Sequence, residues 1–171
     1  MRGNILKLKN KIKILTVISI FSINSVFSFE YGYTSDGFKY VKHEHNEASY
    51  QHAWCSAKKG IEEYQNPDFT RVDCLTDENA VEFDFANKWA ESIGQALHYQ
   101  LMTGKKGKVI LILEHPQQET VYYNRVKALA DIYNFDVEYI TPEILCIKED
   151  GCCPYLDCKC NRKKQKINTN K

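Results

Sequence analysis

The sequence predicts an α/β fold in which helices flank a mixed central sheet. Three short strand candidates lie between two helical segments, and a continuous apolar run at 108–114 is typical of a strand buried on both faces. A further helix and strand follow, so the expected order is an αβββαβ core plus a further helix and strand. The chain has 171 residues, of which 43% are hydrophobic, and this suits one domain with a single core.

The first half of this domain begins with an aromatic, glycine-bearing segment at 29–42, which we expect to be irregular or extended. A helix is expected from about His45 to Lys58, ending at Gly60. Three strands are expected at 60–64, 69–75 and 80–85, because turn-forming residues separate them. They are short enough to form an antiparallel meander.

The second half contains the clearest helical pattern, at 87–103, where Ile93 and Ala96 fall on one apolar side and Gly104 ends the pattern. The apolar strand at 108–114 comes next. A helix at about 120–133 and a strand at 136–140 complete the predicted fold.

Both ends of the chain differ from this domain, which we place at 29–145. Residues 1–28 contain five basic residues, no acid, and an apolar run of 14 residues before a small-residue cleavage site, the layout of a signal peptide. The run is shorter than the ~20 residues that span a bilayer, so an uncleaved anchor is the less favoured alternative. We expect an exported protein, periplasmic or secreted, with no stable membrane anchor after cleavage. Residues 146–171, cysteine-rich and then basic, are expected to form a disordered tail.

The charge of the exported part is acidic. Without residues 1–28 the chain has 18 basic and 22 acidic residues, and residues 29–158 have 12 and 22. Such a body lacks the broad basic face of a general nucleic-acid binder. The charge argues against tight duplex binding but leaves open a hydrolase that recruits phosphates through metal ions.

Three carboxylates on two neighbouring strand candidates indicate chemistry. Side chains alternate along a strand, so Arg71 and Asp73 are expected on one side, and Val72 and Cys74 on the other.

On the next strand, Glu82 and Asp84 share a side. If the two strands pair through the turn at 76–79, Asp73 and Glu82 face each other within reach of a cation. Oxygen ligands suit Mg²⁺ or Mn²⁺. A divalent metal ion with a positively charged side chain nearby is the composition of a phosphodiesterase site.

The following helix adds a polar stripe, since Lys88, Ser92, Gln95 and Tyr99 are spaced by four, three and four residues. The stripe begins four residues after Asp84. We therefore expect Lys88 beside the acidic strand, where its amine contacts the attacking water or a phosphate, with Gln95 and Tyr99 extending the site.

These residues resemble the PD-(D/E)xK nuclease superfamily, which has the same helix and strand order. Asp73 matches the acid of its second strand, Glu82 the acid of its third, and Gln95-x-x-x-Tyr99 the helix motif of its RecB-like branch. Glu47 lies where many members have an additional acid. The resemblance spans about 47–140, and the segments TRVDCLT, EFDFANKWAE and IGQALHY also resemble a group of small exported bacterial proteins of this fold.

The resemblance implies a nuclease that hydrolyses phosphodiester bonds of DNA or RNA with Mg²⁺ or Mn²⁺. The implied roles are catalysis for Asp73, Glu82 and Lys88, additional metal ligation for Glu47 and Asp84, and substrate binding for Arg71, Gln95 and Tyr99. The chain departs from the family in one respect: Asp84 occupies the position of the family's lysine, and the nearest lysine is Lys88.

A second hypothesis is a catalytically inactive protein of the same fold that acts as an exported binding or interaction module, with a protein partner that the sequence does not identify. The strand acids would then form a solvated face paired with Arg71 and Lys88. The missing acid-x-lysine pattern and the acidic body favour this alternative.

Seven cysteines in an exported chain indicate disulfides, and an odd number leaves at least one cysteine for another use. We expect a structural disulfide between Cys55 and Cys74, which are 19 residues apart, linking the first helix to the strand that carries Asp73. The late cluster CCPYLDCKC is compatible with zinc, although an oxidising compartment favours disulfides.

Histidines are a further source of metal ligands. His43 and His45 lie in the segment KHEHNE, and His52 and His98 could join them in space. Solvated histidines are the favoured interpretation, because an oxygen-rich site prefers magnesium or manganese to imidazole-bound zinc.

Overall fold

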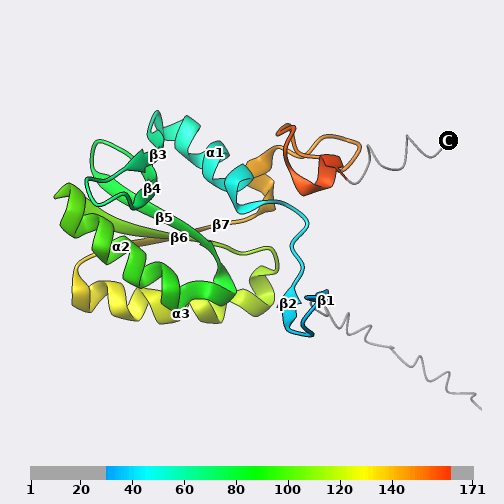
Figure 1. The fold of residues 1–171 in the computed structure, drawn as a ribbon, viewed down its shortest axis with the longest axis horizontal. Coiled ribbons are helices and arrows are strands. Elements are labelled where there is room, and N and C mark those ends of the chain that lie inside the picture. The colour runs from blue at the N-terminus through cyan, green and yellow to red at the C-terminus, as the bar shows by residue number, and fades with distance from the viewer. Residues whose placement is uncertain (1–29, 163–171) are drawn as a thin grey trace, which may run out of the picture.

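A computed structural model describes residues 30–162, in which a five-stranded sheet is present. The sheet lies between layers of helices (Figure 1). The expected signal peptide at 1–28 lies outside the described residues, as do residues 163–171 of the expected tail. None of the described helices is long and apolar enough to cross a membrane.

The sheet has the strand order β3-β4-β5-β6-β7. Its strands are β3 (Ile61–Gln65), β4 (Arg71–Leu75), β5 (Asn79–Phe85), β6 (Lys106–Ile112) and β7 (Asp136–Ile140). The pairs β3–β4 and β4–β5 are antiparallel, whereas β5–β6 and β6–β7 are parallel. The mixed sheet and the antiparallel meander of β3 to β5 confirm the predicted α/β fold.

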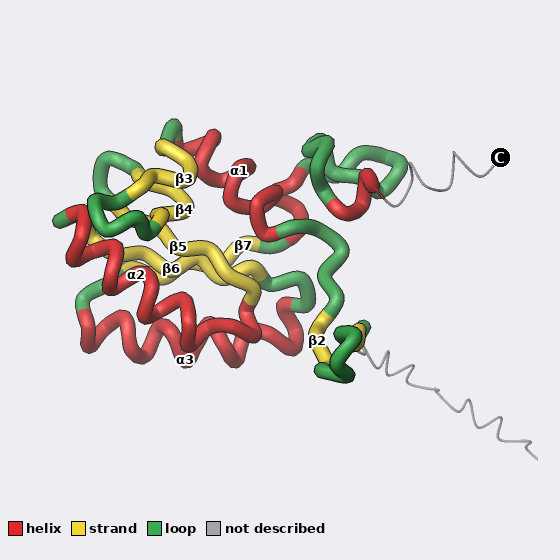
Figure 2. The backbone as a smooth tube through the Cα atoms, in the orientation of Figure 1, coloured by secondary structure: helices red, strands yellow, loops and turns green. Residues whose placement is uncertain are grey.

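Helix α1 (Glu47–Lys58) covers one face of the sheet, and α2 (Trp89–Thr103) and α3 (Pro116–Tyr133) cover the other (Figure 2). The short helix η1 (Ala86–Lys88) joins β5 to α2, and η2 (Pro142–Leu145) follows β7. The lead-in segment forms a small hairpin of β1 (Tyr31–Tyr33) and β2 (Lys39–Val41). As expected, α2 ends at Gly104, whose φ of +68° is accessible to glycine without strain.

Helix α3 begins earlier than the sequence pattern suggested. It starts at Pro116 instead of about residue 120, because proline at the first position of a helix has the required φ and needs no hydrogen-bond acceptor. The backbone N–H of His115 donates to Glu119 within the first turn.

Alternation along β5 places its acids on one face of the sheet. Val81 and Phe83 pack with α1 and with Ile110 of β6. Glu82 and Asp84 therefore lie on the opposite face, in register with Val109 and Leu111, which pack against α2 and α3.

The Cys55–Cys74 disulfide joins α1 to β4, the pair expected from the sequence. Gly60 lies against this bridge, where an added Cβ would be 2.5 Å from the sulfur of Cys74 and 2.8 Å from that of Cys55. Any larger residue at position 60 would displace the bridge.

The expectation that Val72 and Cys74 share a face of β4 was wrong. Val72 packs with Tyr99 of α2, whereas Cys74 packs with α1. Regular pairing is interrupted between them. The register of β3 and β4 contains no Glu63–Asp73 pair, Glu63 has a φ of +52°, and the carbonyl of Asp73 accepts a hydrogen bond from the side chain of Gln51. This local distortion turns β4 at Asp73.

Residues 146–162, which we expected to begin a disordered tail, pack against the domain. Cys153 and Cys158 are fully buried and belong to the same core cluster as Tyr50 and Leu145. The cysteine-rich segment is therefore part of the hydrophobic core.

Candidate functional site

The strand acids meet where β4 and β5 diverge. The two strands pair at Cys74–Val81 and Leu75–Ala80. Beyond these pairs the carboxylate of Asp73 accepts the backbone N–H of Phe83 at 2.7 Å, in place of a regular strand hydrogen bond. This contact turns the Asp73 side chain towards β5.

Asp73 and Glu82 form a hydrogen-bonded carboxyl pair. Burial raises the pKa of Glu82, and repulsion from Asp73 and Asp84 raises it further. Burial also raises the pKa of Asp73, while the N–H of Phe83 opposes that shift by stabilising its charge. In the absence of a cation Glu82 therefore keeps its proton, and its O–H donates a hydrogen bond to the carboxylate of Asp73.

One oxygen of this pair has no hydrogen-bond partner among the described residues. Glu82 is 4% exposed, and its Oε2 is buried and unsatisfied. Leaving a buried acceptor unpaired costs about 1–3 kcal/mol, more when the group is charged. Such an oxygen suits a ligand atom for a cation.

A second carboxyl pair, Glu47 and Asp84, lies beside the first. Glu47 begins α1, and burial together with repulsion from Asp84 and Asp73 raises its pKa to about 7. The Lys88 amine is 3.2 Å from Asp84 Oδ1 and also lowers the pKa of Glu47. Lys88 is therefore next to the acids, as expected, but its ion-pair partner is Asp84.

The three predicted substrate-binding residues lie in different surroundings. Tyr99 of α2 is 5% exposed, and its hydroxyl donates a hydrogen bond to the carboxyl group of Glu82. Gln95 lies half-buried on the same helix, and its side chain makes no hydrogen bond within residues 30–162. Arg71 is exposed and lies 3.3 Å from Glu63 of β3. Of the basic candidates, only Lys88 contacts the acid cluster, by which we mean Glu47, Asp73, Glu82 and Asp84.

An open cavity of about 510 Å³ adjoins the second carboxyl pair. Its lining combines Glu47 and Lys88 with residues of the β1–β2 hairpin, including Tyr31 and Lys39. The Lys39 amine lies 3.6 Å from the centre of the Tyr31 ring. Of the four acids, Glu47 thus borders a space that is also lined by lysines and aromatic rings.

Sequence reasoning missed a histidine and carboxylate pair whose histidine, His43, lines the same cavity. His43 Nδ1 lies 2.7 Å from Glu114, and the ring of His43 stacks on Phe85 with centroids 3.4 Å apart. Tyr50 donates a second hydrogen bond to Glu114. The sequence favoured a solvated His43, with metal ligation as the alternative. The pairing could not be anticipated, because Glu114 follows a strand 71 residues later and no local pattern joins the two.

The four acids have the ligand chemistry of a hard divalent cation, although among the described residues no three of them place one oxygen each within 4.8 Å of one another. Carboxylate oxygens are the ligands that Mg²⁺ and Mn²⁺ prefer, and raised pKa values indicate a cluster with too little positive charge nearby. Lys88 supplies one compensating charge. The buried, unpaired oxygen of Glu82 is the atom with most to gain from an additional cation.

Comparisons with protein-family models, with curated proteins and with solved structures found no match to this chain.

Proposed function

We propose that the protein is a metal-dependent nuclease that hydrolyses phosphodiester bonds. The observation that carries this proposal is the buried Glu82, with an unpaired oxygen, among three further carboxylates whose pKa values are raised. An arrangement of this kind is unfavourable without a cation and becomes favourable with one. The resemblance of Asp73, Glu82 and Tyr99 to the PD-(D/E)xK pattern supports the same reading.

Asp73 and Glu82 would hold Mg²⁺ or Mn²⁺, with Glu47 and Asp84 as further ligands. A bound ion of this type stabilises negative charge on a phosphate and lowers the pKa of a coordinated water. Tyr99 orients Glu82 through their hydrogen bond, and Lys88 neutralises charge beside Asp84. In this proposal Tyr99 is a positioning residue and does not contact substrate.

The cavity beside Glu47 and Lys88 would receive the nucleic acid. Lys39 and Lys88 attract phosphate, and Tyr31 provides an aromatic face on which an unstacked base can rest. Single strands present such bases, and the acidic body disfavours wide contact with a duplex. We therefore expect single-stranded substrates to be cleaved faster than duplexes.

Export through residues 1–28 is part of the proposal, and the Cys55–Cys74 disulfide is consistent with an oxidising compartment. N-terminal sequencing of the protein recovered outside the cytoplasm tests it. A mature chain that begins near residue 29 supports export, whereas a chain that retains residues 1–28 in the cytoplasm contradicts it.

The nuclease activity is tested by incubating purified protein with single- and double-stranded DNA and RNA, with Mg²⁺ or Mn²⁺ and with chelator. Cleavage should require the divalent ion and should be lost in both Asp73→Asn and Glu82→Gln. The matched control is Asp131→Asn, which removes an exposed acid of α3 and should leave cleavage unchanged. Equal cleavage by the parent and by both site variants would reject this site.

A second candidate function is a non-catalytic binding module of the same fold. It is favoured by Asp84, which occupies the position of the family's lysine and takes Lys88 as its ion-pair partner. If none of the substrates is cleaved and calorimetry detects no binding of Mg²⁺ or Mn²⁺, this function replaces the first.

A further inference from the structure

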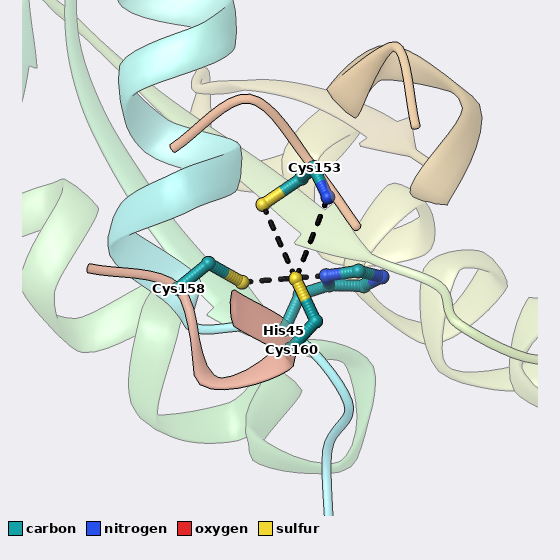
Figure 3. A group of neighbouring side chains, drawn as sticks. All are labelled: His45, Cys153, Cys158 and Cys160. Carbon is teal, nitrogen blue, oxygen red and sulfur yellow. Dashed lines mark hydrogen bonds between the residues drawn. The ribbon is translucent and has the colours of Figure 1, made fainter. Parts of the chain in front are cut away.

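Three cysteines and a histidine from opposite ends of the described chain converge on one point (Figure 3). One potential ligand atom from each of His45, Cys153, Cys158 and Cys160 lies within 4.8 Å of the other three. His45 precedes α1, whereas the cysteines follow η2, so the group joins segments 113 residues apart. No other group meeting this criterion is found among residues 30–162.

The spacing of these atoms matches a tetrahedral metal site. Cys153 Sγ and Cys160 Sγ are 3.6 Å apart, and His45 Nδ1 is 3.3 Å from Cys158 Sγ. A zinc ion with Zn–S bonds of ~2.3 Å separates its sulfur ligands by about 3.8 Å, the edge of the tetrahedron. The four ligand atoms therefore already lie close to the distances that zinc requires.

Hydrogen-bond donors surround the sulfur atoms as they do at metal-bound thiolates. Cys158 Sγ accepts from the backbone N–H groups of Cys160 and Asn46 and from the hydroxyl of Ser49. Cys160 Sγ accepts the backbone N–H of Cys153 at 3.4 Å. These donors stabilise negative charge on sulfur and hold each ligand in place.

Three of the four side chains are buried and Cys160 is half-buried, so the group is integrated into the core. His45 is 3% exposed, and Cys153 and Cys158 are fully buried beside Tyr50. Asn46 donates to the carbonyl of Asp157 at 3.0 Å, which adds a second link between the same two segments. Four protein ligands in a buried position are typical of structural zinc sites, which have no open coordination position.

We propose that His45, Cys153, Cys158 and Cys160 bind one Zn²⁺ ion, which fixes the C-terminal segment to the start of α1. Thiolate and imidazole ligands favour Zn²⁺ over the hard cations expected at the acid cluster, so the two sites select different metals. Zinc also protects its thiolates from oxidation, and this reconciles three reduced cysteines with the Cys55–Cys74 disulfide. The proposal does not depend on the nuclease function.

The experiment is metal analysis of the purified protein, followed by replacement of the metal with Co²⁺. We expect one equivalent of zinc per chain, and visible and thiolate charge-transfer bands typical of tetrahedral Co²⁺ with cysteine ligands. Cys160→Ser should lose most of the zinc, whereas Cys146→Ser, which removes an exposed cysteine outside the group, should retain it.

Two further variants keep the test decisive if Cys160→Ser does not fold. His45→Cys should retain one metal ion and strengthen the thiolate charge-transfer bands of Co²⁺, because a fourth sulfur replaces the imidazole. Asp73→Asn should retain full zinc content, which separates this site from the acid cluster. Less than half an equivalent of zinc in the parent, or an unchanged Co²⁺ spectrum in His45→Cys, would overturn the proposal.

The competing arrangement is a disulfide within the group. Mass spectrometry after alkylation of free thiols under denaturing conditions, with metal chelated, distinguishes the two. Free thiols at Cys153, Cys158 and Cys160 support the metal site. A stoichiometric disulfide between any two of them excludes it.

Discussion

The acid cluster and the cysteine–histidine group both concentrate negative charge, but they do so with different side chains. Each places several groups that bear or can acquire negative charge in a poorly hydrated position, where they repel one another. At the acid cluster, protons and Lys88 supply the compensating charge, and a cavity adjoins Glu47 and Lys88. At the cysteine–histidine group, backbone donors surround the sulfurs and two of the cysteines are fully buried.

This difference suggests different roles for the two sites. An exchangeable hard cation next to a cavity suits catalysis, because substrate must reach it. A soft metal enclosed by four protein ligands suits a structural role, because nothing else needs to reach it.

The largest expected effect comes from removing a ligand of the proposed zinc ion. Cys158→Ser should lower the free energy of unfolding by about 4 kcal/mol or more, the class of change seen when a protein loses a metal. Urea unfolding of the variant, compared with that of Cys146→Ser, measures it. Equal stability of the two variants would mean that the cysteine–histidine group contributes nothing to the fold.

The disulfide provides the next test, since it also anchors a segment but lies beside the acids. Replacing both Cys55 and Cys74 by alanine should lower the free energy of unfolding by about 3 kcal/mol, the chain-entropy effect of a 19-residue loop. Zinc content should not change, because the bridge shares no ligand with the group at His45. Loss of zinc in this variant would show that the two regions are coupled.

The acid cluster should respond in activity more than in stability. Glu82→Gln should reduce the rate of cleavage by at least about 100-fold, because it removes a charged ligand where charge develops. Tyr99→Phe should reduce it by about 10-fold, since it only releases the hydroxyl that orients Glu82. Kinetics with a single-stranded substrate measure both, and a larger loss in Tyr99→Phe would contradict the assigned roles.

A further test is the dependence of stability on pH in protein without added Mg²⁺. The pKa of Glu47 is raised from 4.5 to about 7, so the folded protein binds this proton more tightly than the unfolded chain does. The unfolding free energy therefore falls as pH rises from about 4.5 to about 7. Thermal unfolding at about pH 5 and pH 8 measures the slope.

Two further measurements test the role of Glu47 in this pH dependence. Glu47→Gln should reduce the pH dependence, while Asp73, Glu82 and Asp84, whose pKa values are also raised, retain the rest of it. Added Mg²⁺ should raise the melting temperature more at about pH 8 than at about pH 5, where protons compete with the ion. A parent protein whose stability rises over the same pH range would show that the carboxyl pairs do not retain their protons.

Much of the acid cluster could be predicted because its parts are close in sequence. Asp73 and Glu82 flank a single turn, and strand alternation brings Asp84 to the same side as Glu82. The partner of Lys88 was harder to anticipate, since η1 precedes α2 and directs the amine to Asp84. The turn of β4 at Asp73 depends on Gln51 and Glu63, which no local period reveals.

The sequence by itself determined the α/β fold, the order of its elements and the position of the acids, because alternating and helical periodicities are local properties of the chain. The tertiary structure alone decided that His45 meets Cys158 across 113 residues and that His43 meets Glu114 across 71. Such contacts follow from how α1 packs on the sheet and how the segment after η2 returns to it. Packing of distant segments depends on the whole core, and no short stretch of sequence encodes it.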